Sequence, residues 1–405
     1  MVNMCMNKII AVAIVLLVAS LTSCSKGQKN SGNENVPKLS FDDISIAEGT
    51  GAVSNAEIRL VLDHAYSKQV TVNYTTIEGT AKAGQDFVAA TNQSISFQPN
   101  ETEKKIVVAI ITDDVKEGDE VFQVRVESPV NVVLLKTTAA VTVRNDDTKI
   151  SFNNTGFEAP TSYPGYTLAW NDEFNGTTLD AAYWSAETGD GCPGVCGWGN
   201  NELQYYLAPP NNLFFQDGKM IIEAKSESYG GKNYTSSRIK TQNKKTFKYG
   251  RIDIRAILPK GKGIWPAFWM LPQDNVFGGW PRSGEIDIME LIGSEPSKAA
   301  ATVHYGPGPG SIYINKSYTL PGSTFNDAFH VFSMEWQQDV MKFYVDNILY
   351  ATINKADLGS NNYPFNESFY FLINMAVGGN LPGSPDATTI FPQWLIVDYI
   401  RIYQQ

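Results

Sequence analysis

The chain is poor in cysteine and histidine, with four and three of these residues among 405. Cys5 and Cys24 fall in the N-terminal segment, which leaves Cys192 and Cys196 in a Gly/Pro-rich loop. Further zinc-type ligands are missing from the sequence around this pair, which argues against a metal site. In an exported chain, two cysteines this close predict a disulfide bond, with two free thiols as the alternative.

The chain also lacks an excess of positive charge and an apolar run that could span a membrane. Its formal net charge is −10. That balance excludes a nucleic-acid partner and electrostatic adhesion to anionic membranes, and it disfavours a polyanionic substrate. The apolar run at residues 9–19 is too short to cross a bilayer as a helix.

Residues 1–23 have the features of an export signal. Lys8 supplies positive charge before the apolar run, and the sequence Leu-Thr-Ser-Cys ending at Cys24 resembles a bacterial lipobox. Cleavage before Cys24 would leave a lipidated cysteine, which predicts a bacterial lipoprotein anchored in the outer membrane or at the cell surface. An ordinary secretory signal with an incidental cysteine is the alternative. In either case the protein leaves the cytoplasm.

The chain shows no convincing long helix and no internal repeat, and its length favours two domains. Residues 24–37 are polar and are expected to form a flexible linker. Short alternating strands over 38–147 predict a small β-sandwich. A second linker is expected over 148–163, followed over 164–405 by a large antiparallel sandwich of jelly-roll type. The predicted fold class is therefore all-β.

Acidic residues gather at the strand ends of the smaller sandwich, where hard oxygen ligands suit Ca²⁺. The order of the segments 47–49, 80–87, 113–120 and 145–147 resembles Calx-beta domains over their whole length. The resemblance implies a calcium site, and a spacer with ordinary polar loops is the alternative. The candidate ligands are Glu48, Asp86, Asp114, Glu117 and Asp147.

The most informative segment reads Gly-Glu-Ile-Asp-Ile-Met-Glu at residues 284–290. Strand alternation places Glu285 and Asp287 on one face, and a one-residue bulge at positions 288 and 289 would return Glu290 to it. Paired carboxylates of this kind can flank a glycosidic bond, one as nucleophile and one as acid/base. A solvated strand face is the alternative.

Tryptophans surround this acidic segment. Trp265 and Trp269 are four residues apart and share one face of a strand, which is interpreted as a sugar-binding cleft. Burial of either indole in the core is the alternative. Trp280, in the loop before the acidic strand, is expected to be a sugar platform. The opposite face of the tryptophan strand is expected to carry core residues: Pro266, Phe268 and Met270.

Residues 166–405 resemble glycoside hydrolase family 16, in particular its laminarinase-like branch of endo-β-1,3-glucanases. The matching stretches are 170–176, 197–206, 237–239, 249–251, 265–271, 285–290, 303–306, 329–336 and 374–379.

The resemblance implies catalytic roles for the three acids. Glu285 matches the nucleophile, Glu290 the general acid/base, and Asp287 the helper between them. Attack by one carboxylate and protonation by the other give net retention, with the carboxyl groups about 5–5.5 Å apart. Because three close carboxylates cannot all ionise freely, at least one pKa should rise. Catalysis of this kind requires no cofactor.

The resemblance also implies binding residues. Asn200, Asn201 and Arg238 match positions that line the glycone side of the cleft, and His304 matches a cleft position. Their alternatives are turn hydrogen bonds for the asparagines, a surface ion pair for Arg238 and a structural role for His304. His330 is expected to be structural.

A structural calcium ion is a further implication of the resemblance. Glu173 in the first strand and Asp398 in the last would meet at the closure of the larger sandwich, with a backbone carbonyl near Gly218. A simple polar contact between strand ends is the alternative.

Taken together, the sequence predicts a monomeric endo-hydrolase of β-1,3-glucan such as laminarin, because the net negative charge and the tryptophans favour a neutral glucan. A family 16 hydrolase of mixed-linkage glucan or of a galactan is an alternative. A catalytically inactive glycan-binding protein is another, although retention of Glu285 and Glu290 argues against it.

Overall fold

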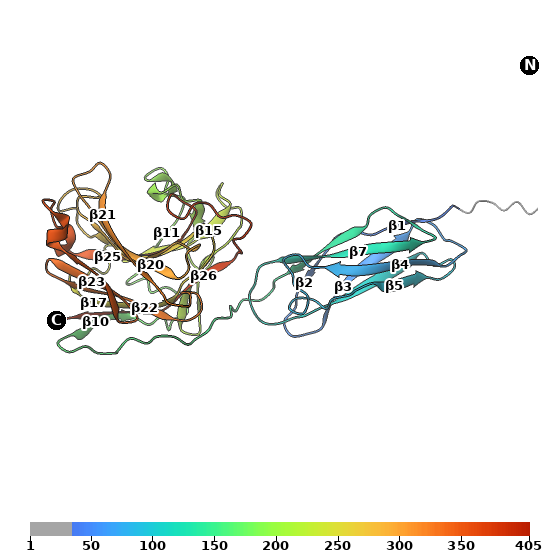
Figure 1. Cartoon of the computed structure of the whole chain (residues 1–405), viewed down its shortest axis with the longest axis horizontal. Coiled ribbons are helices and arrows are strands. Elements are labelled where there is room, and N and C mark those ends of the chain that lie inside the picture. The colour runs from blue at the N-terminus through green and yellow to red at the C-terminus, as the bar shows by residue number, and fades with distance from the viewer. Residues whose placement is uncertain (1–34) are drawn as a thin grey trace, which may run out of the picture.

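The computed structural model describes residues 35–405 and is built almost entirely of strands, as the sequence predicts (Figure 1). The predicted signal peptide, Cys24 and most of the predicted linker at 24–37 lie outside the described residues. Within the described part of the chain, no helix is both long enough and apolar enough to cross a membrane.

The smaller sandwich consists of two sheets. One has four strands in the order β6-β3-β1-β8, and the other has five strands in the order β2-β9-β7-β4-β5. Alternating burial along β3 sends Ala56, Ile58, Leu60 and Leu62 into a core between the sheets, as a strand period of two requires. The strands are β1 (Lys38–Ser40), β2 (Ile44–Ala47), β3 (Ser54–Leu62), β4 (Val70–Ile77), β5 (Gln93–Phe97), β6 (Glu103–Ile110), β7 (Glu120–Val130), β8 (Val133–Leu134) and β9 (Thr138–Arg144).

The larger sandwich contains a seven-stranded sheet, in the order β11-β16-β25-β18-β19-β20-β21. Its second sheet has the order β13-β14-β26-β17-β22-β23-β24, with β10 also paired to β26, and a short pair joins β12 to β15. The elements up to the tryptophan strand are β10 (Thr167–Asp172), β11 (Ser185–Glu187), η1 (Cys196–Gly199), β12 (Gln204–Tyr206), β13 (Leu213–Gln216), β14 (Lys219–Ala224), β15 (Tyr234–Ser236), β16 (Arg238–Lys240), β17 (Gly250–Ile257) and β18 (Ile264–Pro272). The remaining elements are β19 (Glu285–Leu291), β20 (Lys298–Tyr305), β21 (Ile312–Thr319), β22 (His330–Gln337), β23 (Val340–Val345), β24 (Ile348–Asn354), η2 (Lys355–Leu358), η3 (Pro364–Asn366), β25 (Phe369–Val377) and β26 (Gln393–Gln404).

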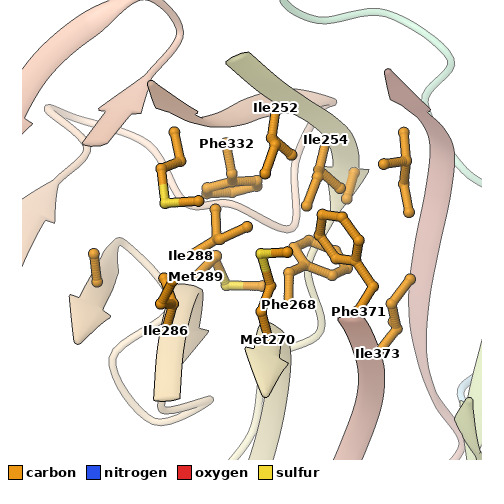
Figure 2. Close-up of a cluster of buried hydrophobic side chains, with 14 of the residues drawn as sticks. Ile252, Ile254, Phe268, Met270, Ile286, Ile288, Met289, Phe332, Phe371 and Ile373 are labelled. Atoms are coloured by element: carbon orange, nitrogen blue, oxygen red, sulfur yellow. The ribbon is translucent and has the colours of Figure 1, made fainter. Parts of the chain in front are cut away.

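The core of this sandwich lies between its two sheets. Figure 2 shows Ile252, Ile254 and Phe332 from one sheet facing Phe268 and Met270 of β18. The buried side chains Ile286, Ile288 and Met289 of β19 join them. Because this face of the seven-stranded sheet is committed to the core, the polar residues between them are directed to the opposite face.

The segment predicted as a linker over 148–163 is packed against the larger sandwich. Ile150 is 3% exposed and lies in a cluster with Ile221, Phe329 and Ile396. The side chain of Gln216 accepts from the backbone N–H of Ile150 at 2.8 Å and donates to its carbonyl at 2.9 Å. These contacts hold in place a segment whose asparagines, glycine and prolines are typical of a linker.

Candidate active site

The bulge predicted in the acidic strand is present. On one side of β19, Asp287 pairs with Trp269 and Glu290 with Ala267, so one intervening residue of β18 faces two of β19. On the other side, Asp287 pairs with Thr302 and Glu290 with Ala300. The extra residue at positions 288 and 289 therefore restores Glu290 to the face of Glu285 and Asp287.

That face of the seven-stranded sheet forms an open cleft of about 1060 Å³. All three acids line it, and so do six of the seven residues predicted to bind substrate: Asn200, Arg238, Trp265, Trp269, Trp280 and His304. The sheet thus brings together side chains that are as much as 104 positions apart in the sequence.

Glu285 has partners that favour its charged form. The indole N–H of Trp280 donates to its Oε2 at 2.7 Å. The Nε2 atom of His304 lies 3.8 Å from its Oε1 and 3.3 Å from Oδ2 of Asp287. His304 is itself held by a hydrogen bond between its Nδ1 and the hydroxyl of Ser311 at 3.0 Å.

Glu290 is held by neutral donors. Its Oε1 accepts from the indole N–H of Trp265 at 3.2 Å, and its Oε2 accepts from the hydroxyl of Thr302 at 3.0 Å. The Thr302 hydroxyl accepts in turn from the amide of Asn315 at 2.8 Å. These bonds fix the carboxyl group through neutral donors, and His304 also acts on its charge.

Asp287 is the most buried of the three acids, with 3% exposure, and its Oδ2 has no hydrogen-bond partner among the described residues. Burial and the charge of Glu290 raise the pKa of Asp287 well above its usual range. Both causes disfavour the charged form of this aspartate.

The pKa values of the other two acids also rise. Burial, followed by the charge of Asp287, raises the pKa of Glu285 to about 8, while His304 and Trp280 oppose the rise. Burial raises the pKa of Glu290. When Asp287 carries the proton, its charge no longer acts on Glu285, so Glu285 can ionise more readily.

The tryptophan strand is divided between two faces as the sequence predicts. Trp265 and Trp269 are half-buried and line the cleft, whereas Pro266, Phe268 and Met270 are buried. Trp280 is 54% exposed at the cleft margin, which fits a platform better than a core position.

Arg238 is a buried residue of the cleft wall. It is 8% exposed, and its Nε forms an ion pair with Glu187 at 2.5 Å. Its guanidinium group lies 4.4 Å from the ring centre of Trp198 and 4.8 Å from that of Trp269. The alternative, an ion pair on the protein surface, is therefore wrong about the location. The ion pair exists, but it is buried beside two indole rings.

Among the described residues, Asn201 is the predicted binding residue that does not line the cleft. It is exposed and donates to the side chain of Asn380 at 2.9 Å, and its φ of 57° places it in a turn. Asn200 does line the cleft. His330 is bonded to Asp346 at 2.6 Å, which agrees with the structural role expected for it.

Several cleft residues were missed by sequence reasoning. Glu202 and Asn374 are buried polar residues that line the cleft, and Trp198 and Tyr313 add aromatic surface. Glu202 directly follows the two asparagines of a matching stretch, so its position was visible. Its burial was not, because an acid beside a Gly/Asn turn normally faces solvent.

A disulfide bond joins Cys192 and Cys196. The bonded loop leads directly into η1, which carries Trp198 to the cleft.

The calcium pair predicted from Glu173 and Asp398 does not fit the structure. Both carboxylate oxygens of Glu173 accept from Arg401, each at 2.8 Å. Asp398 forms ion pairs with Lys219 at 2.8 Å and with Arg255 at 2.5 Å. Because basic side chains already neutralise both acids, a divalent cation would have to displace them.

Acids of the smaller sandwich do gather at one end. Carboxylate oxygens of Asp86, Glu117 and Glu120 lie within 4.8 Å of one another. Burial and the charges of neighbouring acids raise the pKa of Glu48 to about 7, and burial with the adjacent Asp86 raises that of Glu120 to about 8. Asp147 is 8% exposed, and its Oδ2 has no partner in the described chain.

Asp113, which was not among the candidate ligands, contributes charge to Glu48 and Glu117. Glu120 also belongs to the group, although it was not predicted as a ligand.

Replacing Trp280 by phenylalanine distinguishes the effect of its indole N–H from the effect of its aromatic ring. Trp280→Phe keeps an aromatic platform but removes the donor to Glu285, and that donor lowers the pKa of Glu285. The acidic limb of the kcat/KM profile should therefore move to higher pH, by about 0.5–1 unit for an exposed donor to a charged acceptor. An acidic limb at the wild-type pH would contradict this role.

Comparisons with known proteins agree with this geometry. Residues 201–390 match the family model for glycosyl hydrolases family 16, and residues 33–147 match the Calx-beta domain model. The chain is 43% identical over 264 residues to glucan endo-1,3-beta-glucosidase A1 of Niallia circulans, a match that covers 60% of this chain and 38% of that protein's length.

Two further matches cover most of the other protein. The chain is 38% identical over 254 residues to a beta-glucanase of Rhodothermus marinus, covering 60% of this chain and 86% of the relative. The crystal structure of the laminarinase catalytic domain of Thermotoga maritima MSB8 matches with a TM-score of 0.56 and 43% identity, covering 59% of this chain and 98% of that one. The acids, the cleft and these matches lead to one conclusion: the chain belongs to family 16 of the glycosyl hydrolases.

Proposed function

We propose that the larger sandwich is a retaining endo-hydrolase of β-1,3-glucan of the laminarin type. The observation that carries this proposal is the bulged strand, which presents Glu285, Asp287 and Glu290 together on the floor of a tryptophan-lined cleft. The β-1,3 linkage is supported by the relatives, which are named as endo-1,3-beta-glucosidase and laminarinase. An open cleft admits a chain that extends beyond it at both ends, which favours internal cleavage.

The proposed reaction has two balanced steps. In the first, a carboxylate oxygen of Glu285 forms a bond to the anomeric carbon while the glycosidic oxygen leaves and takes the proton of Glu290. In the second, Glu290 removes a proton from water, the water oxygen bonds to the anomeric carbon, and the ester to Glu285 breaks. Two inversions give net retention.

Asp287 supports the nucleophile in this scheme. Its raised pKa favours its neutral form, which lessens the repulsion of the charge on Glu285. Trp280 and His304 also favour the charged form of Glu285, because both lower its pKa.

Product analysis on laminarin, lichenan and agarose tests the substrate, with Glu285→Ser as the control. The wild type is expected to release a series of oligosaccharides from laminarin, and the variant none. Faster release from lichenan or agarose would favour the alternatives, a mixed-linkage glucanase or a galactanase. Binding without release from any of the three would identify a glycan-binding protein.

We also propose that the acidic end of the smaller sandwich binds Ca²⁺. The donor set is all oxygen, and Asp147 directs a buried, unpartnered oxygen at a group that includes Glu48. A cation there would offset the repulsion that raises the pKa values of Glu48 and Glu120.

This site predicts how the stability of the smaller sandwich depends on pH. Because the folded-state pKa values of Glu48 and Glu120 lie above their usual value of 4.5, the folded state binds more protons, and stability falls as pH rises from about 5 to 8. Calcium should remove this loss and raise the unfolding temperature at pH 8. Calorimetry with Ca²⁺ and with chelator checks this.

A matched variant sharpens the calcium test. Asp147→Asn should abolish the calcium-dependent increase in unfolding temperature, whereas Glu57→Gln, within β3 and paired with Lys105, should leave it unchanged. Equal unfolding temperatures with Ca²⁺ and with chelator in the wild type would contradict the site.

We further propose that the protein is exported and anchored by lipid at Cys24. The support is the signal-like composition of residues 1–23 and the lipobox-like sequence before Cys24. Labelled palmitate should enter the wild type and not Cys24→Ser, and the variant should leave the membrane fraction. A wild type that takes up no label would contradict the anchor.

A further inference from the structure

A buried chain of hydrogen bonds connects Trp269, one of the tryptophans that line the cleft, to Glu202. The indole N–H of Trp269 donates to Oδ1 of Asn374 at 2.7 Å, and the Asn374 amide donates to the hydroxyl of Tyr206 at 3.0 Å. Tyr206 donates to Oε2 of Glu202 at 3.3 Å. Glu202, Tyr206 and Asn374 are 5%, 0% and 6% exposed.

The direction of this chain is fixed by what each group can donate. An indole can only donate, so the Asn374 carbonyl must face Trp269 and its amide must face Tyr206. The Tyr206 hydroxyl must then donate its hydrogen bond to Glu202, which also accepts from Gln204 at 2.7 Å. A buried polar group left without a partner costs about 1–3 kcal/mol, so one arrangement is strongly favoured.

A second restraint meets Trp269 from its ring face. The guanidinium of Arg238 lies 4.8 Å from the ring centre of Trp269, and Arg238 is itself held by Glu187 and Trp198. Trp269 is thus held along one edge by the hydrogen-bond chain and across one face by a cation. An aromatic platform that is fixed before binding loses less conformational entropy when a sugar stacks on it.

Resting on the proposed function, we propose that Glu202, Tyr206 and Asn374 are positioning residues that hold Trp269 ready for the glycan. Affinity then depends on this chain of bonds, whereas bond cleavage does not. The acids have their own partners: Trp280 and His304 for Glu285, and Trp265 and Thr302 for Glu290.

Tyr206 is the most informative residue to change, because it does not line the cleft and can reach a substrate only through its neighbours. Tyr206→Phe keeps the ring and removes the central hydroxyl. KM for laminarin should rise by about 5–10-fold, with kcat changed by less than about twofold. Tyr399→Phe is the matched control: Tyr399 is 2% exposed and its hydroxyl accepts from the backbone of Ala159 at 3.1 Å, in the other sheet.

A double-mutant cycle tests the connection itself. Trp269→Phe removes the donor at the end of the chain, so adding Tyr206→Phe should raise KM little further. Independent, multiplying effects on KM would overturn the proposal, as would a Tyr206→Phe variant that loses kcat and keeps KM. If Tyr206→Phe is poorly folded, Glu202→Gln and Glu202→Leu replace it: the glutamine retains an acceptor and should bind glycan more tightly than the leucine.

A measurement without turnover separates this proposal from the proposed function. With ¹⁵N-labelled tryptophan, the indole N–H resonance of Trp269 is identified by its loss in Trp269→Phe. It should shift in Tyr206→Phe and stay in place in Tyr399→Phe. An unshifted resonance in Tyr206→Phe would overturn the positioning role, whereas a shifted resonance together with a wild type that cleaves no glucan would overturn only the proposed reaction.

Discussion

Glu285→Gln should lower kcat on laminarin by at least about 10⁴-fold, the scale seen when a covalent nucleophile is removed. The amide is nearly the same size and can still accept from the Trp280 indole, so the fold and the cleft should be preserved. It cannot form the glycosyl ester, because an amide oxygen is a poor nucleophile and carries no charge. Steady-state hydrolysis measured with reducing-end detection gives the ratio.

The matched control for this change is Glu295→Gln. Glu295 also lines the cleft, but it is exposed and forms an ion pair with Lys298 at 2.9 Å. Its kcat should stay within about twofold of the wild type, as expected for a surface pair. Residual activity of Glu285→Gln near that of the control would contradict the assignment of the nucleophile.

Glu290→Gln should lower kcat on laminarin by about 10²–10⁴-fold, the usual contribution of general acid–base catalysis. The amide can still accept from Trp265 and Thr302, but it cannot protonate the leaving oxygen. An aryl β-laminaribioside with a dinitrophenolate leaving group needs no such proton. Its first step should therefore be nearly as fast in the variant, giving a burst of phenolate and an accumulated glycosyl-enzyme.

Azide provides the second half of that test. It attacks without losing a proton, so it should restore turnover in Glu290→Gln and yield the β-glycosyl azide. An equal loss of rate on laminarin and on the aryl substrate, with no rescue by azide, would show that Glu290 is not the acid/base.

The position of the acids could be predicted because it depends on local rules. A strand has a side-chain period of two, so the spacing of Glu285, Asp287 and Glu290 required an extra residue to bring all three to one face. The buried apolar positions 286, 288 and 289 then identify the face that packs in the core. The same periodicity assigned Trp265 and Trp269 to the cleft.

What the sequence did not disclose depends on contacts between distant segments. Glu173 and Asp398 were paired as calcium ligands because both are acids at strand ends, but Arg401, Lys219 and Arg255 reach them from elsewhere in the chain. Ile150 reads as part of a polar linker until the side chain of Gln216 satisfies its backbone.

The chain of hydrogen bonds from Glu202 to Trp269 could not be predicted from the sequence for the same reason. Its members are 67 positions apart at its ends, and Asn374 joins from a third segment. No periodicity links such residues, since only the pairing of β18 with β25 brings Asn374 within reach of the indole.

¹H NMR of laminarin in the first minutes of digestion shows which anomer the enzyme forms, and so tests retention of configuration during internal cleavage of a β-1,3-glucan. The proposed reaction predicts that the new reducing ends appear first as the β-anomer and convert slowly to the equilibrium mixture. They should belong to oligosaccharides of several lengths. New reducing ends that appear first as the α-anomer would contradict the roles assigned to Glu285 and Glu290.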